Sequence, residues 1–327
     1  MSVKKMDEVP EKKTESKILV KMGKKEQGRC QKESVVLKNG QSTDNGKHVT
    51  VRVQRIRKIH IKQKLIIFSV LAVCLVVLAV FSDHLCPYDP YAQDLSSALQ
   101  APSLQHPMGT DTYGRAMLSR VISGARASIF STFILVAVIS IFGTIVGLCC
   151  GYYGGILDSV MMRISDVCLA FPGLVFALAV AGSLGGGLQN AIIALAAISW
   201  PKYARLARSQ TLSQKETHWM KAVRLSGSST LKIILRHILP NIIGSILVTS
   251  MLDIGTMMME LAALSFLGLG AKPPTAEWGS MVSDTRSLMA TCPWIPFSPG
   301  AAIFLSVIIF NLLGDTIRDY ADPKSRR

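Results

Sequence analysis

Apolar blocks alternate with polar segments from about residue 65 onward, and several of these blocks approach the length that crosses a membrane. A helix needs about 20 predominantly apolar residues to span a hydrocarbon core of about 30 Å. The pattern therefore predicts an all-α integral membrane protein. Its six transmembrane helices are expected near residues 65–81, 129–151, 164–181, 182–201, 242–267 and 300–313.

The N-terminal segment differs from the rest of the chain in composition. Residues 1–60 are rich in Lys, Glu, Ser and Gln and contain few aromatic residues, which predicts a flexible basic tail. The expected parts of the chain are this tail, a first transmembrane helix at 61–82, an extracytoplasmic segment at 83–126, a five-helix core at 127–315 with a connecting loop at 202–240, and a C-terminal tail at 316–327.

The charge distribution favours one orientation in the membrane. The chain has 36 Lys and Arg against 21 Asp and Glu, which gives a formal net charge of +15. About half of the basic residues precede Lys64, and most of the others lie between Lys202 and Arg236 or in the C-terminal tail. Loops rich in Lys and Arg remain in the cytoplasm. We therefore expect both termini and the loop at 202–240 to be cytoplasmic, and the N-terminal tail to contact anionic lipids instead of nucleic acid.

The segment at 221–240, which we call the elbow, predicts two short helices joined by a turn. Gly227 is expected to break the first helix, because glycine adopts backbone angles that other residues resist. Ser228 or Ser229 would cap the second helix, and Pro240 would end it or kink it into the next span. One apolar face of the second helix is formed by Leu231, Ile234 and Leu235. An exposed elbow of this kind suits docking to another protein.

The fifth predicted span carries two carboxylates in an otherwise apolar helix. Asp253, Met257 and Glu260 are spaced i, i+4 and i+7 and so share one face, which Thr256 borders. Ionisable groups inside a membrane are costly and usually face an interior or a water-filled path. The pattern fits the lining of a path for a cation or an amino group, pairing with basic residues of neighbouring helices, or metal coordination. The sequence leaves these three alternatives open.

Small residues indicate how two of the predicted helices pack or bend. The run Phe171-Pro172-Gly173 interrupts the third predicted span. A stripe of small residues lets helices approach closely in lipid. The second span carries such a stripe, with one glycine every four residues, at Gly143, Gly147, Gly151 and Gly155.

Two ion pairs and one disulfide are conceivable from position alone. Asp111 is near enough to Arg115 to pair with it, and Asp166 lies three residues after Arg163, within helical reach. The chain has seven cysteines. Cys86 and Cys292 both fall in predicted outside loops, so a disulfide between them is conceivable.

No catalytic constellation emerges from the sequence. The chain has no GxxxxGK[ST] phosphate loop and no HExxH, CxxC or GxSxG motif, so neither ATP hydrolysis by that route nor another enzyme activity is expected. The histidines are scattered without metal-ligand spacing, and we assign no metal site firmly.

The elbow resembles the "EAA" coupling loop of permease subunits in ABC importers. The matching positions are Ala222, Gly227 and Pro240, while Lys221 stands where the family usually has glutamate. The resemblance implies that the elbow receives a cytoplasmic ATPase. The residues it assigns to this coupling are Lys221, Ala222, Gly227, Leu231, Ile234, Leu235 and Pro240.

Further motifs resemble the peptide and nickel branch of these permeases. HPMGTDTYGR (106–115) is similar to the segment before the second span in that branch, and SFLGLG (265–270) followed by PPTAEWGSM and DTR is similar to another. LDIG (252–255), PTAEWG (274–279) and RLSG (224–227) are most similar to the nickel-transport permease that forms the second membrane subunit. The likeness covers roughly two thirds of the chain.

This resemblance implies a six-helix permease of the type I importer kind that moves nickel or a nickel chelate across the cytoplasmic membrane, with short peptides as the alternative cargo. It also implies a second homologous permease subunit, two ATPase subunits that use ATP, and an extracytoplasmic binding protein. This chain itself would bind no cofactor. An ion-coupled secondary transporter working alone is the rival from another class, but it would favour internal inverted repeats, and none is evident.

Overall fold

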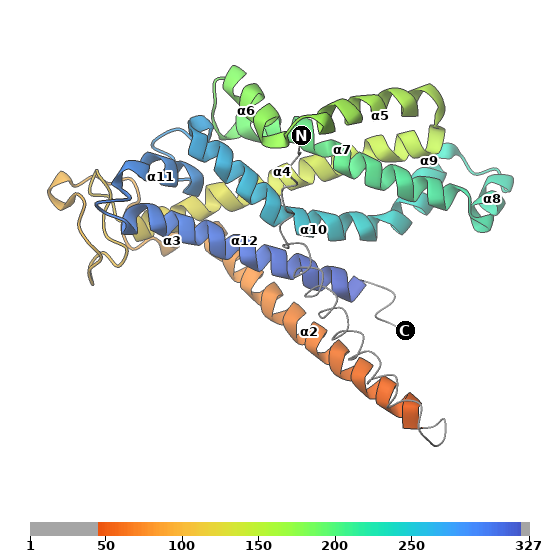
Figure 1. The fold of residues 1–327 in the computed structure, drawn as a ribbon, viewed down its shortest axis with the longest axis horizontal. Coiled ribbons are helices and arrows are strands. Elements are labelled where there is room, and N and C mark those ends of the chain that lie inside the picture. Colours follow the sequence, from red (N-terminus) through yellow and green to blue (C-terminus); the bar gives the residue numbers. More distant parts are fainter. Residues whose placement is uncertain (1–44, 322–327) are drawn as a thin grey trace, which may run out of the picture. The chain divides into compact units, whose positions relative to one another are not determined.

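The computed structural model describes the backbone of residues 45–321 and the side chains from residue 62 onward, apart from that of Arg224 (Figure 1). The described residues from Lys58 onward group into one compact unit. Every regular element in the described range is helical, which confirms the all-α prediction. The longer helices are α2 (Asn45–Val80), α4 (Met117–Tyr153), α5 (Gly155–Ala170), α6 (Gly173–Ser183), α7 (Leu188–Lys215), α10 (Leu239–Leu264) and α12 (Trp294–Ala321).

Short elements connect these helices. Between α2 and α4 lie α3 (Ser82–Leu85) and the 3-10 turn η1 (Leu95–Ser97). The elbow contains α8 (His218–Leu225), α9 (Thr230–Ile233) and the π-helical turn η2 (Ile234–Ile238). After α10 come a second π-helical turn η3 (Ser265–Leu269), α11 (Trp278–Asp284) and the 3-10 turn η4 (Arg286–Leu288).

Four helical segments among the described residues are long and apolar enough to cross a membrane, namely Lys62–Val80, Met117–Tyr153, Thr230–Leu269 and Trp294–Ala321. The pair α5 and α6 makes a fifth if it counts as one span, since the two are bent by 94° at their break. That break falls at Phe171-Pro172, where the sequence predicted an interruption. The fourth predicted span, at 182–201, lies largely in α7, whose apolar half is short because polar residues follow from Lys202 onward.

Several predicted boundaries differ from the helices that form. α2 already begins at Asn45, inside the predicted tail of residues 1–60, and residues 1–44 lie outside the described part of the chain. α4 begins at Met117, earlier than the predicted core start at 127, because the charge of Arg120 is paired and no longer opposes burial. α12 continues through Ala321 into the predicted C-terminal tail.

The glycine stripe forms a close contact in the core, between α4 and α7. A Cβ atom added at Gly143 would lie 2.5 Å from the carbonyl oxygen of Trp200, and one at Gly147 would lie 2.3 Å from that of Ala204. Gly151 packs in the same way against Thr211. Only glycine permits this approach, so the stripe is confirmed as a packing face for its first three members. Gly155 has no atom within 4 Å of such a Cβ and instead starts α5.

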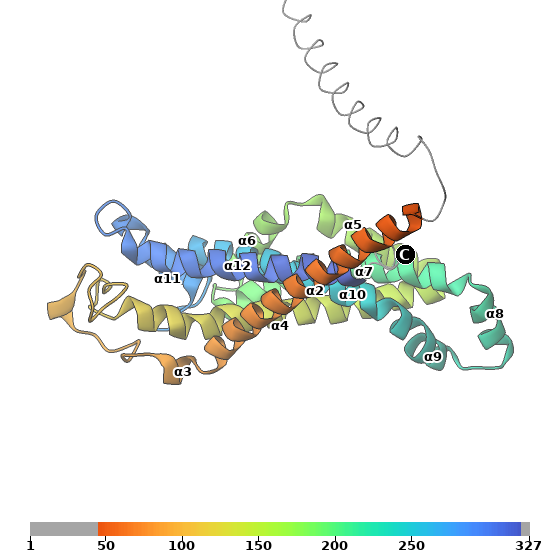
Figure 2. The same ribbon diagram turned by 90° about the horizontal axis from the view of Figure 1, so that it is seen from below.

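α10 packs between α4 and α12 and completes the core (Figure 1). At Gly255 of α10 a Cβ atom would lie 2.1 Å from the Asn311 side-chain oxygen, and at Gly314 of α12 it would lie 3.0 Å from Leu252. Figure 2 shows the loops before α4 together with α11 at one end of the long helices and α8 and α9 at the other. The predicted outside loops and the predicted cytoplasmic elbow therefore lie at opposite ends.

Two buried carboxylates hold the loop end together. Asp111 pairs with Arg115, with Nε 2.6 Å from Oδ2, as the sequence predicted. Glu277 caps α11, accepting hydrogen bonds from the amides of Gly279 and Ser280 at 2.9 and 2.8 Å. The next residue, Trp278, donates its indole N–H to the carbonyl oxygen of Val121 in α4 at 2.8 Å. These bonds fasten the loop after α10 onto α4.

The conceivable disulfide does not form. Cys86 and Cys292 are both free thiols. The Cys86 thiol lies 3.3 Å from the carbonyl oxygen of Ser119, to which it donates. Burial raises the pKa of the Cys86 thiol, and the nearby Asp83 carboxylate adds to the shift.

Candidate functional site

Three basic residues of α7, spaced three apart, each pair with a carboxylate of another helix. Lys202 pairs with Asp253 of α10. Arg205 and Arg208 pair with α5, where Arg205 Nη2 lies 2.6 Å from Oδ1 of Asp166 and Arg208 Nη2 lies 2.6 Å from Oδ2 of Asp158. Residues at i, i+3 and i+6 follow one side of a helix, so α7 joins α5 and α10 through a single row of cations.

This row corrects one predicted pair. Asp166 was expected to pair with Arg163 along α5, but it pairs with Arg205 of α7 instead. Arg163 forms no ion pair with any residue that the structure describes. Asp166 pairs across the two helices instead of along its own helix, because the Arg205 guanidinium of α7 lies directly against α5.

Asp253 is buried and fully engaged. Its side chain is 4% exposed, its Oδ1 accepts from the Lys202 ammonium, and its Oδ2 accepts from the Tyr203 hydroxyl at 2.8 Å. A carboxylate buried inside a helical bundle is stable only when it is paired and hydrogen-bonded. Of the three alternatives that the sequence left open, the pairing alternative describes the geometry of Asp253.

The other members of the predicted face diverge from Asp253. Met257 is buried in the core, whereas Thr256 is exposed. Glu260 is half-buried and forms no hydrogen bond or ion pair with any described residue, although it lies within electrostatic range of Asp253 and Lys202. A face that reads as one stripe in sequence therefore splits into an inward pair and an outward pair. The outward pair, Thr256 and Glu260, is accessible at the surface of this chain, where a partner subunit, water or a ligand can contact it.

The described residues offer no group of three or more His, Cys, Asp or Glu side chains that could hold a metal ion. Asp253 and Met257 point into the packed core, and Glu260 has no second carboxylate, thiol or imidazole beside it in a ligand set. Metal coordination at this face therefore finds no support in the geometry.

The elbow forms as a helix, a turn and a second helix. α8 ends at Leu225, and Gly227 adopts a φ of 75°, the left-handed region that favours glycine. Ser229 takes the N-cap position of α9, although its side chain makes no capping hydrogen bond. Lys221 and Ala222 are both exposed on α8. The sequence thus placed the turn and both of its flanking helices correctly.

The second elbow helix presents an apolar surface that differs from the predicted face. Leu231 and Leu235 are 67% and 53% exposed, and Leu225 across the turn is 89% exposed. Ile234, expected on the same face, is 7% exposed and packs into the core. We call Leu225, Leu231 and Leu235 the elbow patch. Ile234 is therefore part of the elbow's support and not of its exposed surface.

Pro240 neither ends the helix nor breaks it. It occupies the first turn of α10, which continues directly from η2. The Leu239 amide donates to the carbonyl oxygen of Ile234, five residues back, in the wider π-helical turn. Proline lacks an amide hydrogen and normally clashes with the preceding helical turn, so the wider turn accommodates it.

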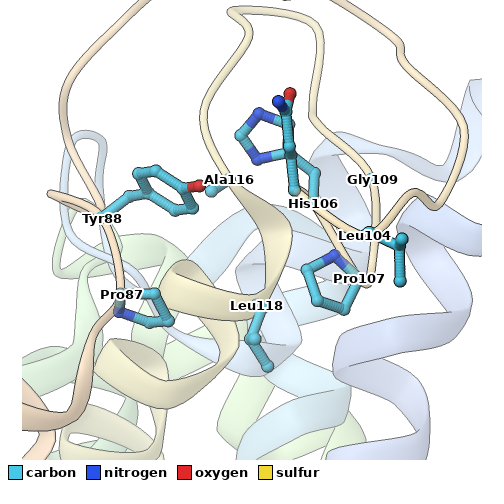
Figure 3. A pocket seen from close by; sticks show the side chains of 9 residues that line it. Pro87, Tyr88, Leu104, His106, Pro107, Gly109, Ala116 and Leu118 are labelled. Atoms are coloured by element: carbon cyan, nitrogen blue, oxygen red, sulfur yellow. The ribbon is translucent and has the colours of Figure 1, made fainter.

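The segment at 106–115 also lines a pocket of about 230 Å³ at the loop end. Figure 3 shows Pro87 and Tyr88 on one side of the start of α4 and His106 and Pro107 on the other. The rings of Tyr88 and His106 lie with centroids 5.1 Å apart. The pocket is small and largely apolar, which fits packing between two loops.

Sequence reasoning missed the partners of the acidic residues. By sequence alone, Lys202, Arg205 and Arg208 indicate only cytoplasmic charge, and no pattern marks Tyr203. Their three-residue spacing, directly after an apolar block, was the available signal.

Comparison with known proteins places the chain among transport proteins. Residues 143–327 match the family described as the binding-protein-dependent transport system inner membrane component. The chain is 44% identical over 272 residues to the glutathione transport system permease protein GsiD of Escherichia coli O6:K15:H31 (strain 536 / UPEC), covering 83% of this chain and 89% of that protein. It is 41% identical over 266 residues to the dipeptide transport system permease protein DppC of Alkalihalophilus pseudofirmus, covering 81% and 88%.

A solved structure shares the fold. The inward-facing MetNI methionine ABC transporter aligns with a TM-score of 0.51 at 18% identity, covering 63% of this chain and 98% of the chain it matches.

Proposed function

Because this chain belongs to the family of binding-protein-dependent transport system inner membrane components, we propose that it serves the import of short peptides. It is a multi-pass membrane permease subunit of an ABC importer and, like its relatives, has no ATPase site of its own. The observation that carries the cargo proposal is its identity of 44% and 41% to permeases named for glutathione and dipeptides. The nickel cargo expected from sequence motifs receives no such support, so the peptide alternative replaces it.

The elbow patch supplies the proposed contact with an ATPase subunit. Leu225, Leu231 and Leu235 expose apolar surface at the end of the molecule opposite the outer loops. Exposed apolar clusters of this kind typically bind a partner. Lys221 and Ala222 of α8 would flank the contact, Gly227 would set the angle of the elbow, and Ile234 and Pro240 would support it from behind.

Glu260 and Thr256 supply the proposed contact with the cargo's path. An ionisable side chain that faces lipid is strongly disfavoured, so the open side of Glu260 requires water or another polar surface. A second permease subunit packed beside α10 would provide a shared path there. Asp253 and Met257, which the sequence grouped with Glu260, would hold the helices that frame this path.

The complete importer would contain this chain, a second homologous permease subunit, two cytoplasmic ATPases that use ATP, and an extracytoplasmic binding protein. Both termini of this chain would lie in the cytoplasm, on the side of the elbow, as the surplus of basic residues favours. Closure of the ATPase pair would then move the elbows and switch the path between its two openings.

Uptake by cells tests the proposed cargo directly. Cells with and without the gene for this chain would receive a radiolabelled dipeptide or radioactive nickel in parallel. The proposal expects loss of dipeptide uptake in the deletion strain and restoration by the gene in trans, with nickel uptake unchanged. Unchanged dipeptide uptake, or a loss confined to nickel, would refute the peptide cargo.

A further inference from the structure

A second and larger pocket lies at the loop end, between the segment before α4 and the loop around α11. Its volume is about 430 Å³, within the roughly 300–1,000 Å³ range of small-molecule sites. Tyr113 and Arg115 line it from the first segment, and Pro274, Thr275 and Asp284 line it from the second. The two predicted outside loops thus form one concave surface.

Two guanidinium groups of the pocket lie beside one buried carboxylate. Arg115 and Arg120 both direct their Nε atoms at the single carboxylate of Asp111, at 2.6 and 3.7 Å from Oδ2. The other oxygen of Asp111 accepts from the backbone amides of Tyr113 and Arg115. Two guanidinium groups therefore share one carboxylate. The second carboxylate of the pocket, Asp284, is exposed and forms an ion pair with neither guanidinium, so the inner part of the pocket carries a local positive charge that attracts anions.

The Arg115 side chain has the donors that a carboxylate requires. Only its Nε bonds to Asp111, and its two terminal nitrogens form no hydrogen bond with any described residue. Its guanidinium carbon lies 4.7 Å from the centre of the Tyr113 ring, which helps to fix its plane. A planar guanidinium with free terminal N–H groups binds carboxylates in a bidentate manner.

We propose that this outer pocket binds the terminal carboxylate of a peptide cargo through the Arg115 guanidinium, an inference that rests on the peptide cargo proposed above. The volume suits a small free molecule, whereas a side chain of a docked protein would fill only part of it. Asp284, exposed at the rim and without an ion pair among the described residues, acts as a competing carboxylate. The pocket would thus hold the cargo briefly where it enters from the outside.

A pair of substitutions at Thr275 tests this without disturbing the fold, since its side chain is exposed and bonds to no described residue. Thr275→Glu places a carboxylate in the pocket, whereas Thr275→Gln adds a side chain of the same size without the charge. The complete importer without its binding protein would be placed in nanodiscs, and binding of radiolabelled dialanine and of dialanine amide would be measured.

The proposal expects dialanine to bind at least about tenfold more tightly than the amide, because the amide lacks the charged partner. Thr275→Glu should remove this preference, Thr275→Gln should retain it, and Asp284→Asn should strengthen it. Equal binding of acid and amide, or equal effects of Glu and Gln at position 275, would overturn the assignment. If Thr275→Glu leaves dialanine binding intact but prevents capture of the binding protein, the carboxylate belongs to that protein and the cargo assignment is wrong.

The outcome is separable from that of the proposed function. Uptake of dialanine by the wild-type importer tests the peptide cargo, and nanodisc binding tests the pocket. Uptake by the wild type together with equal binding of acid and amide would refute the pocket alone.

Discussion

Lys202 and Asp253 form an ion pair whose two ends lie in different surroundings. The Lys202 side chain is 56% exposed, whereas that of Asp253 is 4% exposed. The Tyr203 hydroxyl donates to the second oxygen of the same carboxylate. The pair therefore fastens α7 to α10 at its buried end while leaving the ammonium group accessible. Asp253 is therefore the paired carboxylate of α10, whereas Glu260 forms no ion pair with any described residue.

Removing the Lys202 ammonium should destabilise the bundle. Lys202→Met leaves a buried carboxylate without its cation, at a cost of about 2 kcal/mol. The purified chain should then unfold at a Tm about 5 °C lower. Lys202→Met combined with Asp253→Asn should cost less than the sum of the single changes. Lys232→Met, at an exposed lysine without an ion pair among the described residues, is the matched control and should leave the Tm unchanged. Strict additivity of the two changes would contradict the pairing.

The α4–α7 seam should not tolerate even one methyl group. Gly147→Ala would place a Cβ atom 2.3 Å from the carbonyl oxygen of Ala204, so the two helices must separate. We expect a loss of about 2 kcal/mol, measured as a lower Tm. Gly244→Ala is the control, because a Cβ atom there meets no atom within 4 Å. Equal Tm values for the two variants would show that the close packing of α4 on α7 contributes nothing to the stability of the chain.

The elbow patch should be required for ATPase binding but not for folding. Leu231→Glu or Leu235→Glu adds charge to an exposed surface, so the chain should still insert while the ATPase subunits no longer copurify with it. Lys232→Gln on the same helix removes no apolar surface and should retain them. Ile234→Glu should instead prevent folding, since that side chain is buried. Retention of the ATPases by both leucine variants would place the coupling surface elsewhere.

Glu260 should affect transport more than stability. Glu260→Gln removes the charge from a half-buried carboxylate that makes no hydrogen bond among the described residues, so the Tm should stay constant. Peptide uptake should fall by about tenfold if the carboxylate contacts the cargo's ammonium group. Met259→Gln, at the exposed neighbouring position, is the control for a change in polarity alone. A loss of assembly with the second permease subunit, with no separate effect on uptake, would assign Glu260 to the interface.

Cys86 should react slowly with thiol reagents from outside the cell. Burial raises the pKa of its thiol, so less of the reactive thiolate is present at neutral pH, and the labelling rate should rise only at higher pH. The measurement is the rate of labelling by a membrane-impermeant maleimide in a variant that retains no other cysteine. Leu104→Cys in a cysteine-free chain, at a fully exposed site in the same outer segment, supplies the comparison. Similar rates and pH profiles at the two positions would contradict the burial of Cys86.

The sequence predicted those features that depend on neighbouring residues. The turn at Gly227, the interruption at Phe171-Pro172, the pairing of Asp111 with Arg115 and the glycine stripe of α4 all follow from local spacing or backbone preference. Each is fixed within one or two helical turns, so a linear pattern contains the necessary information.

The predictions that were wrong concern side chains whose contacts depend on which helix packs against them. Ile234 has the same spacing as Leu231 and Leu235, yet only tertiary packing decides that it turns inward. Asp253 and Glu260 are equivalent in sequence, but only Asp253 meets the cation of α7. Cargo depends least on local pattern, because the motifs that suggested nickel occur in segments that the structure uses for packing, as at Gly255 and Trp278.

Reconstitution tests the central claim most directly. This chain, its second permease subunit and the two ATPases would be placed in proteoliposomes, with the binding protein and a radiolabelled dipeptide in the compartment opposite the ATPases. We predict dipeptide accumulation that requires ATP and the binding protein, with nickel not accumulated. Accumulation of nickel in place of the dipeptide, or dipeptide movement that proceeds without ATP, would contradict the account.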